Sequence, residues 1–215
     1  RIQYISSSPF GNKMFSRTIL AAAFLASTNA FAPVVNQAPT STALNAVSIF
    51  FSTSTGNTET DAGYLAEASG VEAVNIADAE SDAVTGADGL IIGAPTWNTG
   101  ADDCRSGTDW DDWLYDTLPD LELEGKPVAI FGCGDQSGYA DNYCDAAGEL
   151  YDLFSAKGCK MMGMTSPDGY EHTESKAIRD DKFVGLMFDE DNQYDMSEDR
   201  AKAWVAQLKE EGFPL

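Results

Sequence analysis

The chain has 215 residues, of which 43% are hydrophobic and 11% aromatic, as is typical of a globular protein with one domain. It has 13 basic and 35 acidic residues, and the first 45 residues hold three of the basic ones and no acid. The remainder therefore has a net charge of −25, which excludes non-specific binding to nucleic acid or to an anionic membrane. Two explanations of this acidity stay open: solubility alone, or docking on basic patches of partner proteins.

The first 45 residues show the pattern of a targeting sequence. Met14 is the first methionine, so we interpret residues 1–13 as upstream translated sequence. After it, Arg17 precedes the short apolar run Ile19–Ala26 and a region of small residues at Ser27–Ala30, as in a cleavable signal peptide. The apolar run is far too short to span a bilayer as a helix.

An uncharged segment rich in Ser, Thr, Ala and Pro follows at residues 34–45. Together with Phe31 directly after the predicted cleavage region, it resembles the bipartite presequences of algae with complex plastids. This resemblance implies delivery to the chloroplast stroma, and simple secretion is the alternative. We expect residues 1–45 to lie outside the fold and residues 46–215 to form the folded domain.

From residue 46 onward, strand and helix patterns alternate, which predicts a parallel sheet covered on both faces. Runs of β-branched and aromatic residues predict strands at Val47–Ser52, Val71–Ile76, Leu90–Gly93, Val128–Phe131 and Lys160–Met164. Apolar residues at helical spacing predict helices at Asn57–Ser69, Arg105–Thr117, Asp141–Lys157 and Ser197–Glu211, and a weaker one near Ser81–Thr85. Five strands with these helices fit a doubly wound α/β fold with strand order 2-1-3-4-5.

The fifth strand is predicted to be interrupted. Its apolar pattern stops at the polar segment Thr165–Lys182, which contains Gly and Pro, and resumes at Phe183–Phe188. We therefore expect an insertion within this strand. Ser197 is predicted to cap the last helix, which presents one apolar stripe to the core. The stripe consists of Ala201, Trp204, Val205 and Leu208.

The first predicted strand ends in small and polar residues where a helix begins. Backbone N–H groups and the positive end of the helix dipole bind phosphate at such a turn, and hydroxyl groups add donors. No Lys follows the glycine, so this is not the phosphate loop of nucleoside triphosphatases. The run predicts a site for one phosphate monoester bound by neutral donors. It consists of Thr53, Ser54, Thr55, Gly56, Asn57 and Thr58.

Two further loops are expected beside this one, because ligands of a doubly wound sheet bind beyond the carboxyl ends of the strands. Residues 93–100 follow strand three and residues 132–139 follow strand four. Each loop presents one aromatic residue, Trp97 or Tyr139, among glycines and small polar residues. Two aromatic rings on facing loops can enclose a flat heterocycle. A phosphate with a planar ring indicates a mononucleotide, and a flavin has the greatest need of such a pair.

These motifs resemble those of flavodoxins. T-x-T-G-N-T, P-T-W-N-x-G and G-x-G-D-Q-x-G-Y-A-D-N occur in order at three strand ends, and the resemblance covers about residues 46–215. The interrupted fifth strand is similar to that of the long-chain class. The resemblance implies a flavodoxin-like sheet with an insertion in strand five, and non-covalent FMN as cofactor. The residues implied to bind FMN are Thr53, Ser54, Thr55, Gly56, Asn57, Thr58, Thr96, Trp97, Asn98, Thr99, Gly100, Cys133, Gly134, Asp135, Tyr139 and Asp141.

The resemblance further implies a monomeric, low-potential one-electron carrier that replaces ferredoxin between photosystem I and ferredoxin–NADP⁺ reductase. No protein residue is then expected to be catalytic, because the cofactor performs the chemistry. An FMN-dependent NAD(P)H:quinone reductase of the same fold is the alternative. A phosphoacceptor signalling domain would instead have an Asp at the end of strand three, where this chain has Gly93-Ala94-Pro95.

The remaining reactive or bulky residues are given structural interpretations. Trp110 and Trp113 are predicted to pack in the interior, whereas His172 and the acidic run Asp189-Glu190-Asp191 are interpreted as solvated loop residues. A single His makes a zinc site unexpected. The cysteine spacing matches neither C-x-x-C nor an iron–sulfur ferredoxin, so we predict free thiols in a reducing compartment. The cysteines are Cys104, Cys133, Cys144 and Cys159.

Overall fold

The computed structural model describes residues 47–215. The targeting sequence predicted for residues 1–45 lies outside the described residues. Within the described part, no helix is both long and apolar enough to cross a bilayer.

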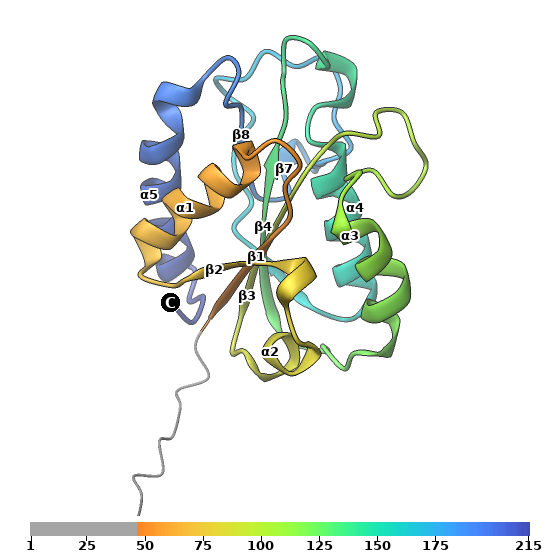
Figure 1. The fold of residues 1–215 in the computed structure, drawn as a ribbon. Helices are drawn as coiled ribbons and strands as arrows, with labels where there is room; N and C mark the ends of the chain where they lie inside the picture. The colour runs from red at the N-terminus through yellow and green to blue at the C-terminus, as the bar shows by residue number, and fades with distance from the viewer. Residues whose placement is uncertain (1–46) are drawn as a thin grey trace, which may run out of the picture. The chain divides into compact units, whose positions relative to one another are not determined.

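A parallel sheet forms the centre of the described region (Figure 1). Its strands follow the order β2-β1-β3-β4-β5, which confirms the predicted doubly wound topology. The final strand segment, β8, pairs with Phe131–Cys133 of β4, directly beyond the pairing of β5 with Pro127–Ala129. The segments β5 and β8 are thus two pieces of one interrupted strand, as the sequence predicts. The bounds are β1 Ser48–Phe51, β2 Ala73–Asn75, β3 Leu90–Pro95, β4 Pro127–Cys133, β5 Lys160–Met162 and β8 Leu186–Phe188.

Helices cover both faces of the sheet. Figure 1 shows α1 (Asn57–Ser69, orange) beside α5 (Tyr194–Glu210, blue) on one face, and α3 (Asp109–Asp112) and α4 (Asp145–Ala156) on the other. Side chains of a strand point alternately to opposite faces. Ile49 accordingly packs in the core under α1 and α5, whereas its neighbour Phe50 belongs to the core under α3 and α4.

Two strands extend further toward the site than predicted. The strands β3 and β4 continue to Pro95 and Cys133 because they pair with each other through Ala94–Gly132 and Pro95–Cys133. Pairing between neighbours thus carries strand structure across Gly and Pro residues that end an apolar pattern. The first helix, α1, has the predicted bounds and is followed by Gly70 in the left-handed conformation, with φ 78°.

The starts of three predicted helices are wrong. The helix predicted from Arg105 begins only at α3 and continues as a π turn, Trp113–Thr117, and a 3₁₀ turn, Leu118–Asp120. The helix predicted from Asp141 begins at Asp145, because Cys144 adopts a left-handed φ of 55° after the 3₁₀ turn Ala140–Asn142. The last helix begins at Tyr194, so Ser197 is a buried interior residue and not the cap.

The insertion contains a small antiparallel hairpin. The strands β6 (Ile178–Arg179) and β7 (Lys182–Phe183) are joined by Asp180 and Asp181, which both have positive φ, as a two-residue hairpin turn requires. At the other edge of the sheet, β2 leads through a 3₁₀ turn, Ile76–Asp78, to the short helix α2 (Ser81–Gly86).

Several interior predictions are confirmed and two are wrong. Trp110 and Trp113 are buried, and all four cysteines are free thiols. His172 is half-buried, and its ring stacks 5.4 Å from that of Tyr143, so it is not a freely solvated residue. Asp189 is fully buried and accepts hydrogen bonds from Gln136 and Asn192, so it is not a solvated residue.

Candidate functional site

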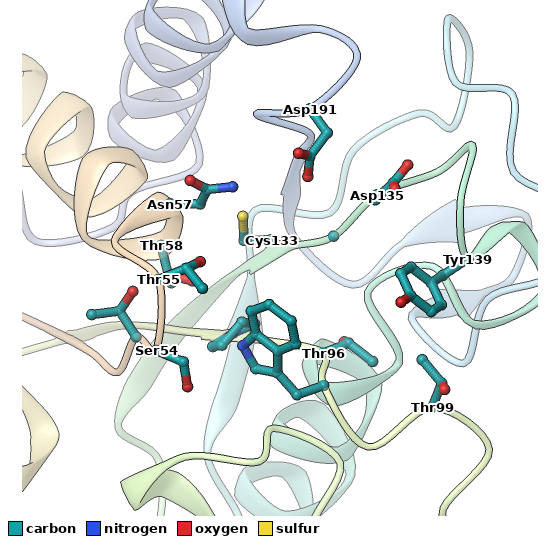
Figure 2. A pocket seen from close by; sticks show the side chains of 14 residues that line it. Ser54, Thr55, Asn57, Thr58, Thr96, Thr99, Cys133, Asp135, Tyr139 and Asp191 are labelled. Atoms are coloured by element: carbon teal, nitrogen blue, oxygen red, sulfur yellow. The ribbon is translucent and has the colours of Figure 1, made fainter.

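A cavity of about 430 Å³ lies beyond the carboxyl ends of β1, β3 and β4. This size and place are typical of a small-molecule site in a doubly wound sheet. Figure 2 shows Ser54, Thr55 and Thr58 on one side of it and Tyr139 on the other, with Cys133 between them. The lining residues are Thr53, Ser54, Thr55, Asn57, Thr58, Pro95, Thr96, Trp97, Thr99, Cys133, Gly134, Asp135, Tyr139 and Asp191.

The structure brings together most of the residues predicted to bind a cofactor. Of the sixteen, four do not line the cavity: Gly56, Asn98, Gly100 and Asp141. Gly56 and Asn98 lie between lining residues, and Gly100 directly follows the lining residue Thr99. Gly56 and Gly100 have positive φ, at 99° and 76°. Asp141 is exposed in the 3₁₀ turn after Tyr139.

The loop after β1 is held by its own backbone and hydroxyl groups. The Thr53 hydroxyl accepts a hydrogen bond of 3.0 Å from the Gly56 N–H, and the Thr60 N–H donates to the Gly56 carbonyl at 3.0 Å. In the part of the chain that the structure describes, no side chain caps α1 at Gly56. The first N–H groups of the helix therefore have no intrahelical acceptor and remain available to an anion at the positive end of the dipole.

The loop that carries Trp97 is fixed by a buried carboxylate from another helix. Glu149 of α4 accepts 2.8 Å hydrogen bonds from the N–H groups of Cys104 and Arg105. The Arg105 carbonyl in turn accepts hydrogen bonds from the Trp97 and Asn98 N–H groups, at 3.2 and 3.1 Å. Glu149 therefore positions the Trp97 backbone through Arg105, although 52 residues separate them.

A close backbone approach supports the same aromatic residue. A Cβ at Gly107 would lie 2.8 Å from the Trp97 Cβ, and Gly107 has a φ of 63°. Both the space and the conformation therefore require glycine behind Trp97. Trp97 is 48% exposed and lies on the cavity wall.

The loop that carries Tyr139 turns around Asp135. One oxygen of Asp135 accepts hydrogen bonds from the Ser137 and Gly138 N–H groups, at 2.9 and 2.8 Å. The hydrogen bond from Gly138 is the main reason that the pKa of Asp135 lies below its ordinary value. Tyr139 then donates its N–H to the Asp135 carbonyl at 3.0 Å, and its side chain is 55% exposed.

A second buried carboxylate joins this loop to the segment between β8 and α5. Asp189 accepts hydrogen bonds from the N–H and side-chain amide of Gln136, at 3.1 and 2.7 Å. Its other oxygen accepts from the N–H groups of Asp191 and Asn192, at 3.2 and 2.9 Å. This bridge places Asp191 on the cavity wall.

The charges around the cavity are negative. Its lining residues include Asp135 and Asp191 and no Lys, Arg or His. Burial, with the charges of Asp135 and Asp189, raises the pKa of Asp191 above its ordinary value. An anionic group at the α1 end must therefore be bound by hydroxyl and backbone donors, and added negative charge near Asp135 is disfavoured.

Sequence reasoning missed two lining residues, Pro95 and Asp191, and the two supporting carboxylates. Glu149 had a usable signal, since a charged residue on the buried side of an apolar helix is unusual unless it is paired. Asp189 had a weaker signal, because an acidic run is ordinarily solvated. Its partner on the Tyr139 loop, Gln136, lies 53 residues away in the sequence.

Comparison with known proteins identifies the family. The family model described as Flavodoxin matches residues 49–204. The chain belongs to the flavodoxin family. A flavodoxin from Picosynechococcus is 46% identical over 170 residues, which cover 77% of this chain and 97% of that protein. Flavodoxin 1 of Escherichia coli is 38% identical over 167 residues, covering 76% and 92%.

A solved structure agrees with this family assignment. The crystal structure of Fusobacterium nucleatum flavodoxin bound to flavin mononucleotide has a TM-score of 0.69 and 28% identity to this chain. The match covers 77% of this chain and 98% of the other. The flavodoxin fold expected from the three sequence motifs is thus confirmed.

Proposed function

We propose that the cavity binds one FMN non-covalently and that the protein is a low-potential one-electron carrier. The observation that carries this proposal is the pairing of an uncapped helix N-terminus with two exposed aromatic residues around one cavity. The first can hold a phosphate, and the second can hold a flat ring. The F. nucleatum flavodoxin bound to flavin mononucleotide supports this choice of ligand.

Each loop has its own role in this proposal. Thr53–Thr58 would bind the phosphate through hydroxyl groups and the first N–H groups of α1. Trp97 and Tyr139 would flank the ring and exclude water from its faces, while the short residues Thr96 and Gly134 would let backbone groups reach its edge. The remaining predicted binding residues would complete the contacts or shape the turns. They are Asn98, Thr99, Gly100, Cys133, Asp135 and Asp141.

FMN, when bound, supplies the electron chemistry, and the protein adjusts its energetics. The carboxylates of Asp135 and Asp191 lie on the cavity wall of a chain whose residues 46–215 have a net charge of −25. Both factors disfavour an additional negative charge on the ring and lower its reduction potential.

An absorption spectrum followed by addition of NADPH tests this proposal. We expect the purified protein to show a flavin spectrum that NADPH alone leaves unchanged and that NADPH with ferredoxin–NADP⁺ reductase bleaches. Bleaching by NADPH alone would assign the chain to the quinone reductases of the same fold. A colourless protein that does not take up added FMN would contradict the binding site itself.

The proposal extends to partners and location. We propose a monomeric carrier between photosystem I and ferredoxin–NADP⁺ reductase in the chloroplast stroma, with residues 1–45 as a presequence. The similarity to cyanobacterial flavodoxins, at 46% identity, and the acidic body support it. A fluorescent fusion of residues 14–45 should reach the stroma, and the same fusion with Phe31→Ala should stop before it. Import of the variant would contradict the targeting proposal.

Docking on a basic reductase should depend on salt. The Debye length shortens from about 30 Å at 0.01 M to about 8 Å at 0.15 M ionic strength, so electrostatic steering weakens over this range. In stopped-flow reduction by the reductase, we expect the rate to fall at high salt, after a maximum if low salt traps unproductive complexes. A rate that rises steadily to high salt would mean that the acidic surface serves solubility alone.

A further inference from the structure

One acidic side chain is buried directly behind the cavity. Asp61 lies on α1 three residues after Thr58, which lines the cavity, so the two residues share one face of the helix. The Asp61 side chain is 0% exposed, and neither of its carboxyl oxygens has a hydrogen-bond partner among the described residues. An ionised carboxylate in such a place is strongly unfavourable.

Among residues 47–215, no basic group stabilises a negative charge on Asp61. Burial raises its pKa well above the ordinary value; the nearby Cys133 thiol acts in the opposite direction, and the charges of Glu190 and Asp189 raise it further. The basic residue Arg200 of α5 packs over the ring of Tyr170, 4.3 Å from its centroid. The charge of Asp61 interacts with titratable groups from several elements around it. They are Tyr64 of α1, Cys133 of β4, Cys144 before α4, Tyr170 of the insertion, and Asp189 and Glu190 before α5. Glu198 of α5 acts on Tyr64.

Asp61 lies beside two residues that line the cavity, Thr58 on the same helix face and Cys133 of β4. Thr58 is 1% exposed and Cys133 5% exposed, and both contribute to the cavity wall. In Figure 2 the Cys133 sulfur points toward Asn57 and Asp191, on the side of the α1 N-terminus. A negative charge on Asp61 would therefore lie within about one helical turn of the N–H groups available to an anion, where water screens it weakly.

We propose that Asp61 keeps its proton while the cavity holds a phosphate-bearing ligand, and that ionisation of Asp61 weakens the binding of this ligand. This inference rests on the proposed function, because the phosphate-bearing ligand is FMN. When Asp61 ionises, its proton passes to solvent. Binding of the anionic ligand to the ionised protein is therefore coupled to the uptake of one proton from solvent by Asp61, as linkage requires.

Titration of the apoprotein with FMN at several pH values tests the proposal. The dissociation constant is measured by quenching of flavin fluorescence from pH 6 to pH 9.5 for the wild type, Asp61→Asn and a control, Glu59→Gln. We expect Asp61→Asn to equal the wild type at pH 6 and to bind roughly tenfold more tightly at the alkaline end, where only the wild type gains a charge. FMN ionises identically in all three titrations, so the ratio of the constants isolates the protein group.

The control variant removes an ordinary charge from the same helix. Glu59 is exposed to solvent in the first turn of α1, whereas Asp61 of the same helix is fully buried. Glu59→Gln should therefore change the affinity by one constant factor at every pH. If Asp61→Asn behaves in the same way, or never differs from the wild type, the proposal is overturned.

A second measurement keeps the test independent of the folding of the variant. The infrared spectrum of the wild-type holoprotein should contain the carbonyl band of a protonated carboxyl group at pH 7. Labelling aspartate with carbon-13 should shift this band. A spectrum without such a band would overturn the proposal. Failure of the proposed function would look different, because neither the wild type nor Glu59→Gln would bind FMN at any pH.

Discussion

The loop after β1 and the two loops that carry aromatic residues are held in different ways. Thr53–Thr58 is held locally, by a hydrogen bond between Thr53 and Gly56 and by the start of α1. The aromatic loops depend on buried carboxylates from distant segments, Glu149 for the Trp97 loop and Asp189 for the Tyr139 loop. The α1 end of the cavity, to which we assign the phosphate, is therefore a property of one short segment. The end to which we assign the ring is a property of the whole fold.

The largest expected effect follows from removing the Asp189 carboxylate. Asp189→Ala leaves the buried N–H and amide donors of Gln136, and those of Asn192, without their acceptor, which we expect to lower the free energy of unfolding by about 3 kcal/mol. Urea unfolding of the apoprotein measures this. Asp195→Ala, which removes an exposed acid of α5, should change stability by less than about 0.5 kcal/mol. Equal effects of the two substitutions would contradict the bridging role.

A smaller and more selective effect is expected at the locally held loop. Thr55→Val removes an exposed hydroxyl donor from a site without Lys and should weaken FMN by roughly 1–3 kcal/mol if a phosphate oxygen is left unpaired. Riboflavin, which has the same ring and no phosphate, should bind both proteins equally, and apoprotein stability should not change. Unchanged affinity of the variant for FMN would remove the phosphate assignment.

The smallest expected effect concerns the Trp97 loop. Glu149→Gln keeps the shape of the side chain but replaces one acceptor oxygen by an amide donor that faces an N–H group. We expect a loss of about 1 kcal/mol in affinity, equal for FMN and riboflavin, because we assign this loop to the ring and not to the phosphate. Fluorescence titrations with both ligands measure this. A loss of affinity for FMN alone would contradict the assignment of the Trp97 loop to the ring.

These two regions also differ in how well the sequence predicts them. The sequence predicts α1 with correct bounds, because turn residues and helix starts are encoded locally. The start of α4 was wrong, because the left-handed Cys144 interrupts an otherwise helical pattern. The burial of Asp189 was also missed. Its hydrogen bonds to Gln136 span 53 residues, so no local pattern distinguishes it from a solvated acid.

The most direct test of the account is the affinity of the wild-type apoprotein for FMN compared with riboflavin, measured by quenching of flavin fluorescence. The uncapped N-terminus of α1 and the hydroxyl groups around it are the only part of the cavity to which we assign the phosphate. We predict that FMN binds at least about a hundredfold more tightly, corresponding to about 2.7 kcal/mol for the phosphate contacts. Equal binding of the two flavins would contradict the central claim that this end of the cavity is built for a phosphate.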